Sequence, residues 1–271
     1  MPPAETDKYI HGHHASVLRS HSWRTAQNSC AYLLPYIRPD MHILDVGCGP
    51  GTITNDLAAL VPSGSVIGLD PAEDVIEKAR ENASIKGVTN VSYAKGDIFH
   101  LDFPDGTFDV VHAHQVLQHV REPVAALREM KRVAKRGGIV AVRESIYDRF
   151  IWHPESKGIE EWSRLYIEVM KSNATEPNAG RMLHAWAREA GFDMKEVKCS
   201  ASCWCYSGEQ SKWWSQIWAD RTVLSNFASI ALEKGLASEG RLQEVKKAWL
   251  EFGEHEDAWF VIPSGEILCI V

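Results

Sequence analysis

Short apolar segments alternate with helical segments between residues 42 and 143, and this alternation limits the chain to few folds. Strands are predicted over residues 42–46, 65–69, 91–94, 109–113 and 139–143, and helices over residues 52–60, 72–86 and 124–133. Each predicted strand is a continuous apolar run, which is typical of strands buried on both faces. The pattern therefore predicts a mostly parallel sheet with helices on both sides.

The remaining residues add helices and two more strands. Residues 197–206 and 260–271 are predicted as strands, the second with a turn at residues 263–265, so that we expect a seven-stranded sheet. Helices are predicted over residues 22–37, 157–175 and 179–190, and residues 208–255 are predicted to be largely helical. No linker or repeat interrupts the chain. We therefore predict one domain, with a core at residues 39–144 flanked by residues 1–38 and 145–271.

The charge of the chain argues against nucleic acid as a partner. Its 271 residues carry a formal net charge of −7, and no run of Lys or Arg forms a basic patch for a phosphate backbone. No apolar run approaches the roughly 20 residues of a membrane span, and the first residues lack the apolar stretch of a signal peptide. We therefore expect a cytoplasmic protein with no membrane partner.

The six cysteines predict neither a disulfide framework nor a metal site. Cys203 and Cys205 are one residue apart and Cys199 precedes them, whereas zinc sites usually combine two pairs with two-residue spacings. We therefore expect structural thiols and no bound metal.

A glycine-rich stretch follows the first predicted strand and is the candidate ligand-binding turn. Gly47, Gly49 and Gly51 come just after Asp45 and directly before the predicted helix 52–60. Glycines there let the backbone approach a ligand closely, with helix-terminal amides facing it. Dinucleotide-binding folds favour the spacing G-x-G-x-x-G, whereas residue 52 is threonine here. By itself, the stretch is also compatible with a tight strand-to-helix turn that binds nothing.

Polar residues end the other predicted strands and should meet the glycines at one edge of the sheet. Asp70 lies 25 positions after Asp45, where a carboxylate can accept hydrogen bonds from both hydroxyls of a ribose. Asp97 follows Gly96 and suits an adenine amino group, although a turn cap is the alternative. His114 ends the fourth strand. The edge is therefore a candidate nucleoside site.

Together, these segments resemble a known family. DVGCGPGTIT, GLDP, GDIFHLDFPDGTFDVV, HQVLQHV and LREMKRVAKRGG are similar to motifs of class I methyltransferases, in particular the ubiquinone/menaquinone-biosynthesis-type subgroup. The resemblance covers residues 40–143 and extends to residues 186–192, while Arg136 departs from the proline usual before the double glycine. It implies a Rossmann-like α/β fold, methyl transfer, and S-adenosyl-L-methionine as the cofactor.

The resemblance also implies which residues bind the cofactor. Gly47, Cys48 and Gly49 would hold its methionine part, with Asp45 reaching the amino group directly or through water. Asp70 would bind the ribose. Pro71, Asp97 and Ile98 would lie at the adenine, with Gly96 directly before Asp97, and the backbone of His114 would contact the amino group.

His119 is the candidate catalytic residue. A sulfonium methyl group is already activated, so the enzyme mainly has to align donor and acceptor, and a base matters only when the acceptor must lose a proton. His119 lies just past the fourth strand. The alternative is a histidine that makes structural hydrogen bonds at the start of a helix.

The N-terminal segment is predicted to form a lid. It contains Tyr9, His21, Trp23 and Arg24, and we expect Tyr9, His21 or Arg24 to contact cofactor or substrate. A solvated polar tail is the alternative, and Trp23 argues against it because large aromatic side chains are rarely left unpacked.

The C-terminal half is rich in tryptophan, including Trp213, Trp214 and Trp218 on a predicted helix. Trp214 and Trp218 share a helix face, which either packs into the core or forms one wall of a substrate pocket. In the second case the acceptor would be apolar or aromatic.

The sequence therefore predicts a small-molecule methyltransferase whose cap is built from the N-terminus and the helices after residue 144. Three alternatives remain: a cofactor-binding module without methyl transfer, a nicotinamide dehydrogenase, and a methyltransferase acting on protein or nucleic acid. The glycine spacing argues against the second and the acidic charge against the third. No oligomeric state is predicted.

Overall fold

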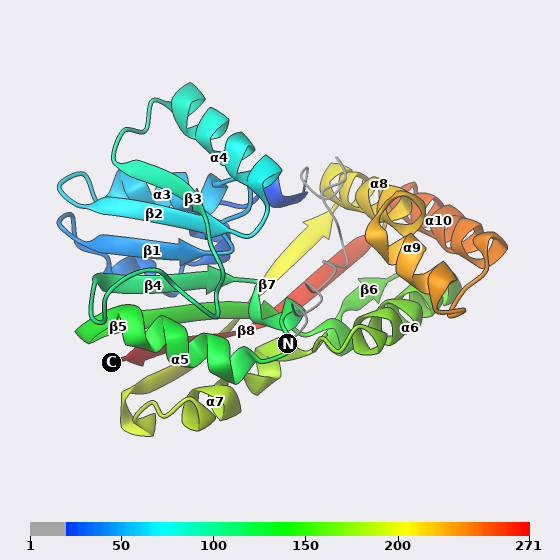
Figure 1. The fold of residues 1–271 in the computed structure, drawn as a ribbon. Helices are drawn as coiled ribbons and strands as arrows, with labels where there is room; N and C mark the ends of the chain where they lie inside the picture. The colour runs from blue at the N-terminus through cyan, green and yellow to red at the C-terminus, as the bar shows by residue number, and fades with distance from the viewer. Residues whose placement is uncertain (1–19) are drawn as a thin grey trace.

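A computed structural model of the protein describes residues 20–271 and contains one eight-stranded sheet (Figure 1). The strand order is β3-β2-β1-β4-β5-β8-β6, and β7 pairs with β8. The bounds are β1 His42–Val46, β2 Ser65–Asp70, β3 Val91–Lys95, β4 Phe108–His114, β5 Ala134–Ser145, β6 Ile151–His153, β7 Val197–Ser207 and β8 Trp259–Ile270. Strands β1 to β5 are parallel, and β8 runs antiparallel to its neighbours.

The helices lie on both faces of the sheet and beyond one end of it. Their bounds are α2 Ala26–Ser29, α3 Thr52–Leu60, α4 Glu73–Lys86, α5 Pro123–Val133, α6 Lys157–Ser172, α7 Ala179–Glu189, α8 Glu209–Leu224, α9 Asn226–Glu233 and α10 Glu239–Gly253. Four 3-10 turns connect them: η1 Leu34–Tyr36, η2 Leu117–His119, η3 Tyr147–Arg149 and η4 Met194–Glu196. The predicted α/β fold with a mostly parallel sheet is confirmed.

Apolar side chains divide between the two faces as the continuous apolar strands require. On one face, Leu57 of α3 packs with Ile43 and Val110. On the other face, Met130 of α5 and Leu183 of α7 pack in one cluster with those residues of the same strands whose side chains point to this second face. The sheet is therefore buried between two helical layers.

Helices α6, α8, α9 and α10 form a cap that lies beyond the ends toward which the parallel strands point (Figure 1). Trp162, Trp218 and Trp249 are fully buried at its centre, with ring centroids 4.5 to 6.1 Å apart. Trp214 is also buried, whereas Trp213 is only partly buried. Core packing is therefore the role of Trp214 and Trp218. Within residues 20–271, no helix has the length and apolar character needed to cross a membrane.

Three details of the predicted fold are wrong. Residues 22–37 do not form one helix, because Thr25 and Asn28 form a capping box that starts the short α2, and Pro35 lies in η1. The turn at residues 263–265 is absent, since these residues pair with β7 on one side and partly with β5 on the other. The three-residue strand β6, too short for a detectable pattern, makes the sheet eight-stranded rather than seven-stranded.

The start of α7 touches the sheet backbone directly. A Cβ atom at Gly180 would lie against the carbonyl oxygen of Glu144 and 2.7 Å from the backbone nitrogen of Gly265. Backbone atoms cannot move aside as a flexible side chain can. Glycine at position 180 therefore allows α7 to lie this close to β5 and β8.

We predict that Gly180→Ala lowers the free energy of unfolding by about 1 to 3 kcal/mol, because the added methyl group overpacks this contact. Gly240→Ala is the matched control, since Gly240 lies in α10 and its nearest non-neighbour atom would be 3.9 Å from the new Cβ. It should be neutral or stabilising. Urea denaturation of both variants checks this, and equal stabilities would contradict it.

Candidate active site

The glycine-rich turn after β1 has a fixed backbone conformation. Gly47, Gly49 and Gly51 all have positive φ angles, of 69°, 55° and 76°. The backbone N–H groups of Gly47 and Cys48 donate to the carbonyl of Leu69 at the end of β2, at 2.7 and 2.9 Å. The turn is therefore fastened to the neighbouring strand, as the residue types require.

Tyr93 of β3 supports this turn, and no sequence motif marks it. Its buried hydroxyl lies 2.7 Å from Asn55 Oδ1 and 3.2 Å from the carbonyl oxygen of Gly51. A Cβ atom at Gly51 would come within 2.5 Å of this hydroxyl. Asn82 of α4 donates to the carbonyl of Pro50 at 2.9 Å. The turn is thus held from β2, β3 and α4.

The two acidic residues at the ends of β1 and β2 differ in surroundings. Asp45 is buried, and its carboxylate accepts from Thr54 Oγ1 at 2.6 Å and lies 2.7 Å from His112 Nδ1. Asp70 is half-buried, and its two oxygens accept from the backbone N–H groups of Gly49 and Ala72, each at 3.1 Å. Asp70 therefore lies beside the glycine-rich turn, while Asp45 is held in the interior beneath it.

The loop after β3 carries Asp97, whose side chain is 62% exposed. Its Oδ1 accepts from the backbone N–H of Phe99 at 2.9 Å, so Asp97 caps its own turn. Gly96 donates to the carbonyl of Asp70 at 3.1 Å, which sets this loop beside the end of β2. Ile98 is buried in the core cluster of α5 and α7, and Pro71 is exposed.

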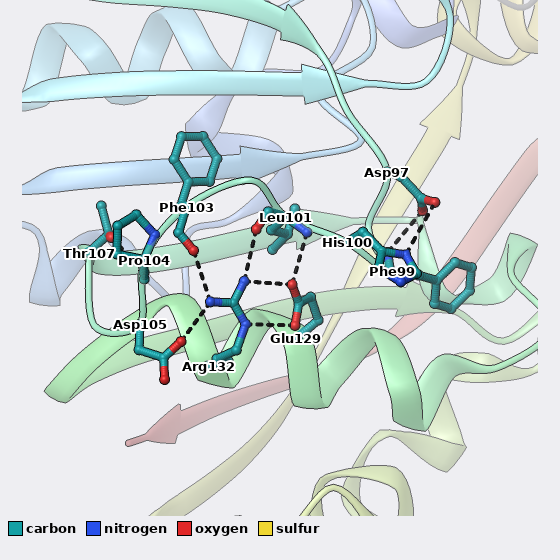
Figure 2. Close-up of polar contacts among 10 residues, drawn as sticks. All are labelled: Asp97, Phe99, His100, Leu101, Phe103, Pro104, Asp105, Thr107, Glu129 and Arg132. Carbon is teal, nitrogen blue, oxygen red and sulfur yellow. Dashed lines mark hydrogen bonds and ion pairs between the residues drawn. The ribbon is translucent and has the colours of Figure 1, made fainter.

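Arg132 of α5 holds the rest of this loop in place (Figure 2). Its guanidinium donates to the carbonyls of Leu101 and Phe103, each at 2.8 Å, and to the carboxylates of Asp105 and Glu129 at 2.7 and 2.6 Å. These ion pairs lower the pKa of Glu129 and raise that of Arg132. The side chain therefore fixes the path of the loop that presents Asp97.

Glu144, at the end of β5, organises the loop after β4, although no sequence motif marks it. Its buried carboxylate accepts from the backbone N–H groups of Val116, Leu117 and Gln118, at 2.9, 2.7 and 3.3 Å. Burial raises the pKa of Glu144 to about 8, against the opposing effect of these donors. The loop that leads from His114 to His119 is therefore clamped by a single side chain.

His114 ends β4 and is tied to the sheet. Its Nε2 lies 2.9 Å from Arg143 Nη1, and Arg143 Nε donates to Ser202 at 2.9 Å and lies 3.5 Å from Glu266. Burial and the nearby Arg24 lower the pKa of His114. A guanidinium can only donate, so the proton of the neutral ring is on Nδ1.

His119 ends η2 on the same loop, with Nε2 3.0 Å from Gln118 Nε2. Burial, and to a smaller extent Arg24, lowers its pKa to about 3. The imidazole is therefore neutral at pH 7 and has a weak affinity for a proton.

The described part of the N-terminal segment lies across this edge. Thr52 Oγ1 donates to the carbonyl of His21 at 3.1 Å, and Arg24 Nη2 donates to Gln115 Oε1 at 2.6 Å. The Trp23 ring packs on Trp204 of β7 at 5.4 Å. Residues 21–24 therefore connect the glycine-rich turn, the loop after β4 and β7. Tyr9 lies outside the described residues.

The candidate residues thus fall into two neighbouring groups. The glycine-rich turn, Asp70 and the Asp97 loop gather at the ends of β1, β2 and β3, while His114, His119 and Arg24 gather at the end of β4. Within residues 20–271, no three His, Cys, Asp or Glu side chains are placed to bind a metal ion.

Comparisons with known proteins show the family and the fold of the chain. Residues 37–208 match a family model described as a methyltransferase domain. An uncharacterized methyltransferase of Schizosaccharomyces pombe is 36% identical over 275 residues, covering 98% of this chain and 97% of the relative. A demethylmenaquinone methyltransferase of Geobacillus stearothermophilus is 32% identical over 169 residues, covering 57% of this chain and 72% of its own.

The fold is also found among solved structures. The YcgJ protein of Bacillus subtilis superposes with a TM-score of 0.58 at 20% identity, covering 89% of this chain and 96% of that one.

We predict that the free energy of unfolding falls as the pH drops below about 6.5. The pKa values of His114 and His119 are lowered on folding, the latter to about 3, so the unfolded chain binds more protons between pH 6.5 and 3. Each such histidine contributes at most about 1.4 kcal/mol per pH unit in that range. Glu144, whose pKa is raised to about 8, binds its proton in the folded state and offsets at most the contribution of one histidine, so the net slope keeps its sign below pH 6.5. Urea denaturation between pH 5.5 and 7.5 measures the slope.

His119→Gln should reduce this slope, whereas His184→Gln, at an exposed position in α7, should leave it unchanged. The same slope in all three proteins would show that His119 is not held neutral by burial.

Proposed function

The chain belongs to the methyltransferase-domain family, and on that premise we propose that it transfers a methyl group from S-adenosyl-L-methionine to a small molecule with an apolar or aromatic body. The observation that carries the proposal is the hydrogen bond between Asp70 and the Gly49 amide, which sets a carboxylate beside a glycine-rich turn at the end of parallel strands. Ligands of open α/β sheets bind at this edge.

The residues present fit the cofactor. We propose that Gly47, Cys48 and Gly49 bind its methionine part. The positive φ angles at positions 47 and 49 favour glycine, and glycine has no side chain that would block a ligand. Asp70 binds the ribose hydroxyls. Asp45, unlike the half-buried Asp70, is buried beneath the turn with both oxygens paired, so we propose that it acts on the cofactor's amino group through water and through the position of the turn.

The adenine and the amino group are assigned to the other strand ends. Pro71, Asp97 and Ile98 surround the adenine, with Gly96 keeping the loop close to β2, and the backbone of His114 contacts the amino group. When bound, S-adenosyl-L-methionine supplies a methyl group already activated by its sulfonium. The chain therefore has to supply alignment and exclusion of water.

His119 is proposed as the residue that acts on the acceptor. The Nε2 atom of the neutral ring, whose pKa is lowered to about 3, faces the amide nitrogen of Gln118, which can only donate. We propose that an O–H or N–H group of the acceptor replaces Gln118 as the donor to Nε2 and is thereby oriented toward the methyl donor. An acceptor that keeps its proton during methyl transfer becomes a far stronger acid. Even this weakly basic ring can then take the proton.

The aromatic side chains favour an apolar or aromatic acceptor. Trp204 lies 5.5 Å from His114 at the end of β4, and Trp23 contacts both Trp204 and Trp213 of the cap helix α8. Trp23 and Trp213 are only partly buried. The part-length similarity to a demethylmenaquinone methyltransferase supports placing the chain near the ubiquinone/menaquinone-type subgroup. Cys30 and Leu33 are buried in the core beside α3, so of the predicted lid over residues 1–38 we propose that residues 20–24 open and close to admit the acceptor.

We predict that Asp70→Ala weakens binding of S-adenosylhomocysteine at least tenfold, because hydrogen bonds to a charged group contribute about 1.5 to 3 kcal/mol. Isothermal titration calorimetry measures the affinity. Asp74→Asn, at an exposed position four residues further on in α4, is the control and should bind as the wild type does. Unchanged affinity in Asp70→Ala would remove Asp70 from the ribose site.

We predict that His119→Ala lowers the turnover number by at least tenfold while the affinity for S-adenosylhomocysteine changes less than threefold. Turnover is followed as release of S-adenosylhomocysteine with a panel of aromatic and apolar acceptors. Intact turnover in the variant would contradict the role of His119. Cofactor binding by the wild type without turnover on any acceptor would favour a binding module instead.

A further inference from the structure

Arg24 and Arg221 lie at opposite ends of the segment formed by residues 20–24, although they are distant in the sequence. Arg221 of α8 is 4% exposed, and its Nη2 donates to the hydroxyl of Ser20. Arg24 donates to Gln115 at the end of β4. Because Ser20 and Arg24 are four residues apart, their Cα atoms lie within about 14 Å of each other. Residues 20–24 therefore connect Arg221 in the cap with Arg24 at the end of β4.

Aromatic rings support both guanidinium groups. Arg24 lies 5.4 Å from the centroid of Trp204, and Arg221 lies 5.1 Å from that of Trp218. Cations stack favourably on such rings, and the rings restrict the orientation of the guanidinium plane. Both side chains are thus preorganised rather than extended into solvent.

Tyr206 of β7 adds a buried donor to the same region. Its ring lies 5.3 Å from Trp23 and stacks on Trp214 at 4.5 Å. The side chain is fully buried, yet its hydroxyl has no hydrogen-bond partner among residues 20–271. Buried tyrosine hydroxyls normally have a partner. The exception points to a ligand atom that accepts a hydrogen bond here.

Ring contacts connect both arginines to Tyr206. Trp204, which supports Arg24, lies 5.4 Å from Trp23, and Trp218, which supports Arg221, lies 5.9 Å from Trp214. Trp23 and Trp214 both contact the Tyr206 ring. Burial raises the pKa of Tyr206, while Arg24, Arg143 and Arg221 act to lower it. Tyr206 therefore keeps its proton and remains a donor. Positive charge and a donor converge where the acceptor is expected, since the cofactor occupies the ends of β1 to β3.

We propose that the methyl acceptor carries a carboxylate on an aromatic body, and that Arg24, Arg221 and Tyr206 bind this carboxylate. The inference rests on the proposed methyl transfer and specifies its substrate class. Guanidinium groups match the two oxygens of a carboxylate, and a tyrosine O–H can donate to either oxygen. Trp23 and Trp213, partly buried, are placed to contact the ring.

The test compares two probes of nearly the same shape, 2-naphthoate and its neutral methyl ketone 2-acetylnaphthalene. Calorimetry measures the binding of each to the full-length protein saturated with S-adenosylhomocysteine. The wild type should bind 2-naphthoate about tenfold more tightly, and this preference should weaken with added salt. Arg24→Gln, Arg221→Gln and Tyr206→Phe should each reduce the preference to threefold or less.

Arg164→Gln, at an exposed position in α6 of the same cap, is the control and should keep the full preference. Cofactor affinity checks that each variant is folded, and Tyr206→Phe removes a single oxygen from the packed core. Equal binding of the two probes, binding of neither at millimolar concentration, or a preference that survives all three variants would overturn the inference. Turnover on neutral aromatic acceptors with no preference for the acid would leave the proposed function standing.

Discussion

The fold depends on the antiparallel strand β8, because its two ends belong to different hydrophobic cores. Near its C-terminal end, Ile267 and Leu268 pack against the helices on opposite faces of the parallel sheet, whereas Phe260 at its start packs with the tryptophans of the cap. The same strand pairs with β5, β6 and β7. A cap held by backbone hydrogen bonds of one continuous strand is fixed relative to the sheet edge that carries the site.

A second constraint is the row of buried polar residues on one face of the sheet. Adjacent strands place Asp45 beside His112, and His114, Arg143 and Glu266 side by side, because paired residues of neighbouring strands share a face. Buried charges cost desolvation free energy unless they are paired and hydrogen bonded. Here the pairing runs across four strands, so the ends of β1, β4, β5 and β8 are held in register beneath the site.

Most of the cofactor region could be predicted from the sequence, since its determinants are local. The strand β1 and the helix α3 begin and end where their apolar patterns and flanking glycines indicate. Asp70 and Asp97 reach one edge because parallel strands align their carboxyl ends. The supports of that edge were not predictable: Tyr93, Arg132 and Glu144 act on backbone atoms up to 42 residues away, and no spacing rule links them to those partners.

By itself, the sequence determined the alternation of strands and helices, the glycine-rich turn, and the family to which the chain belongs, because each is encoded in short contiguous patterns. Only the tertiary structure decided that Trp214 and Trp218 build a core rather than a pocket wall, and that Arg24 and Arg221 lie at the two ends of one short segment. Burial and pairing of residues about 200 positions apart depend on how the cap packs against the sheet, which local periodicity does not specify.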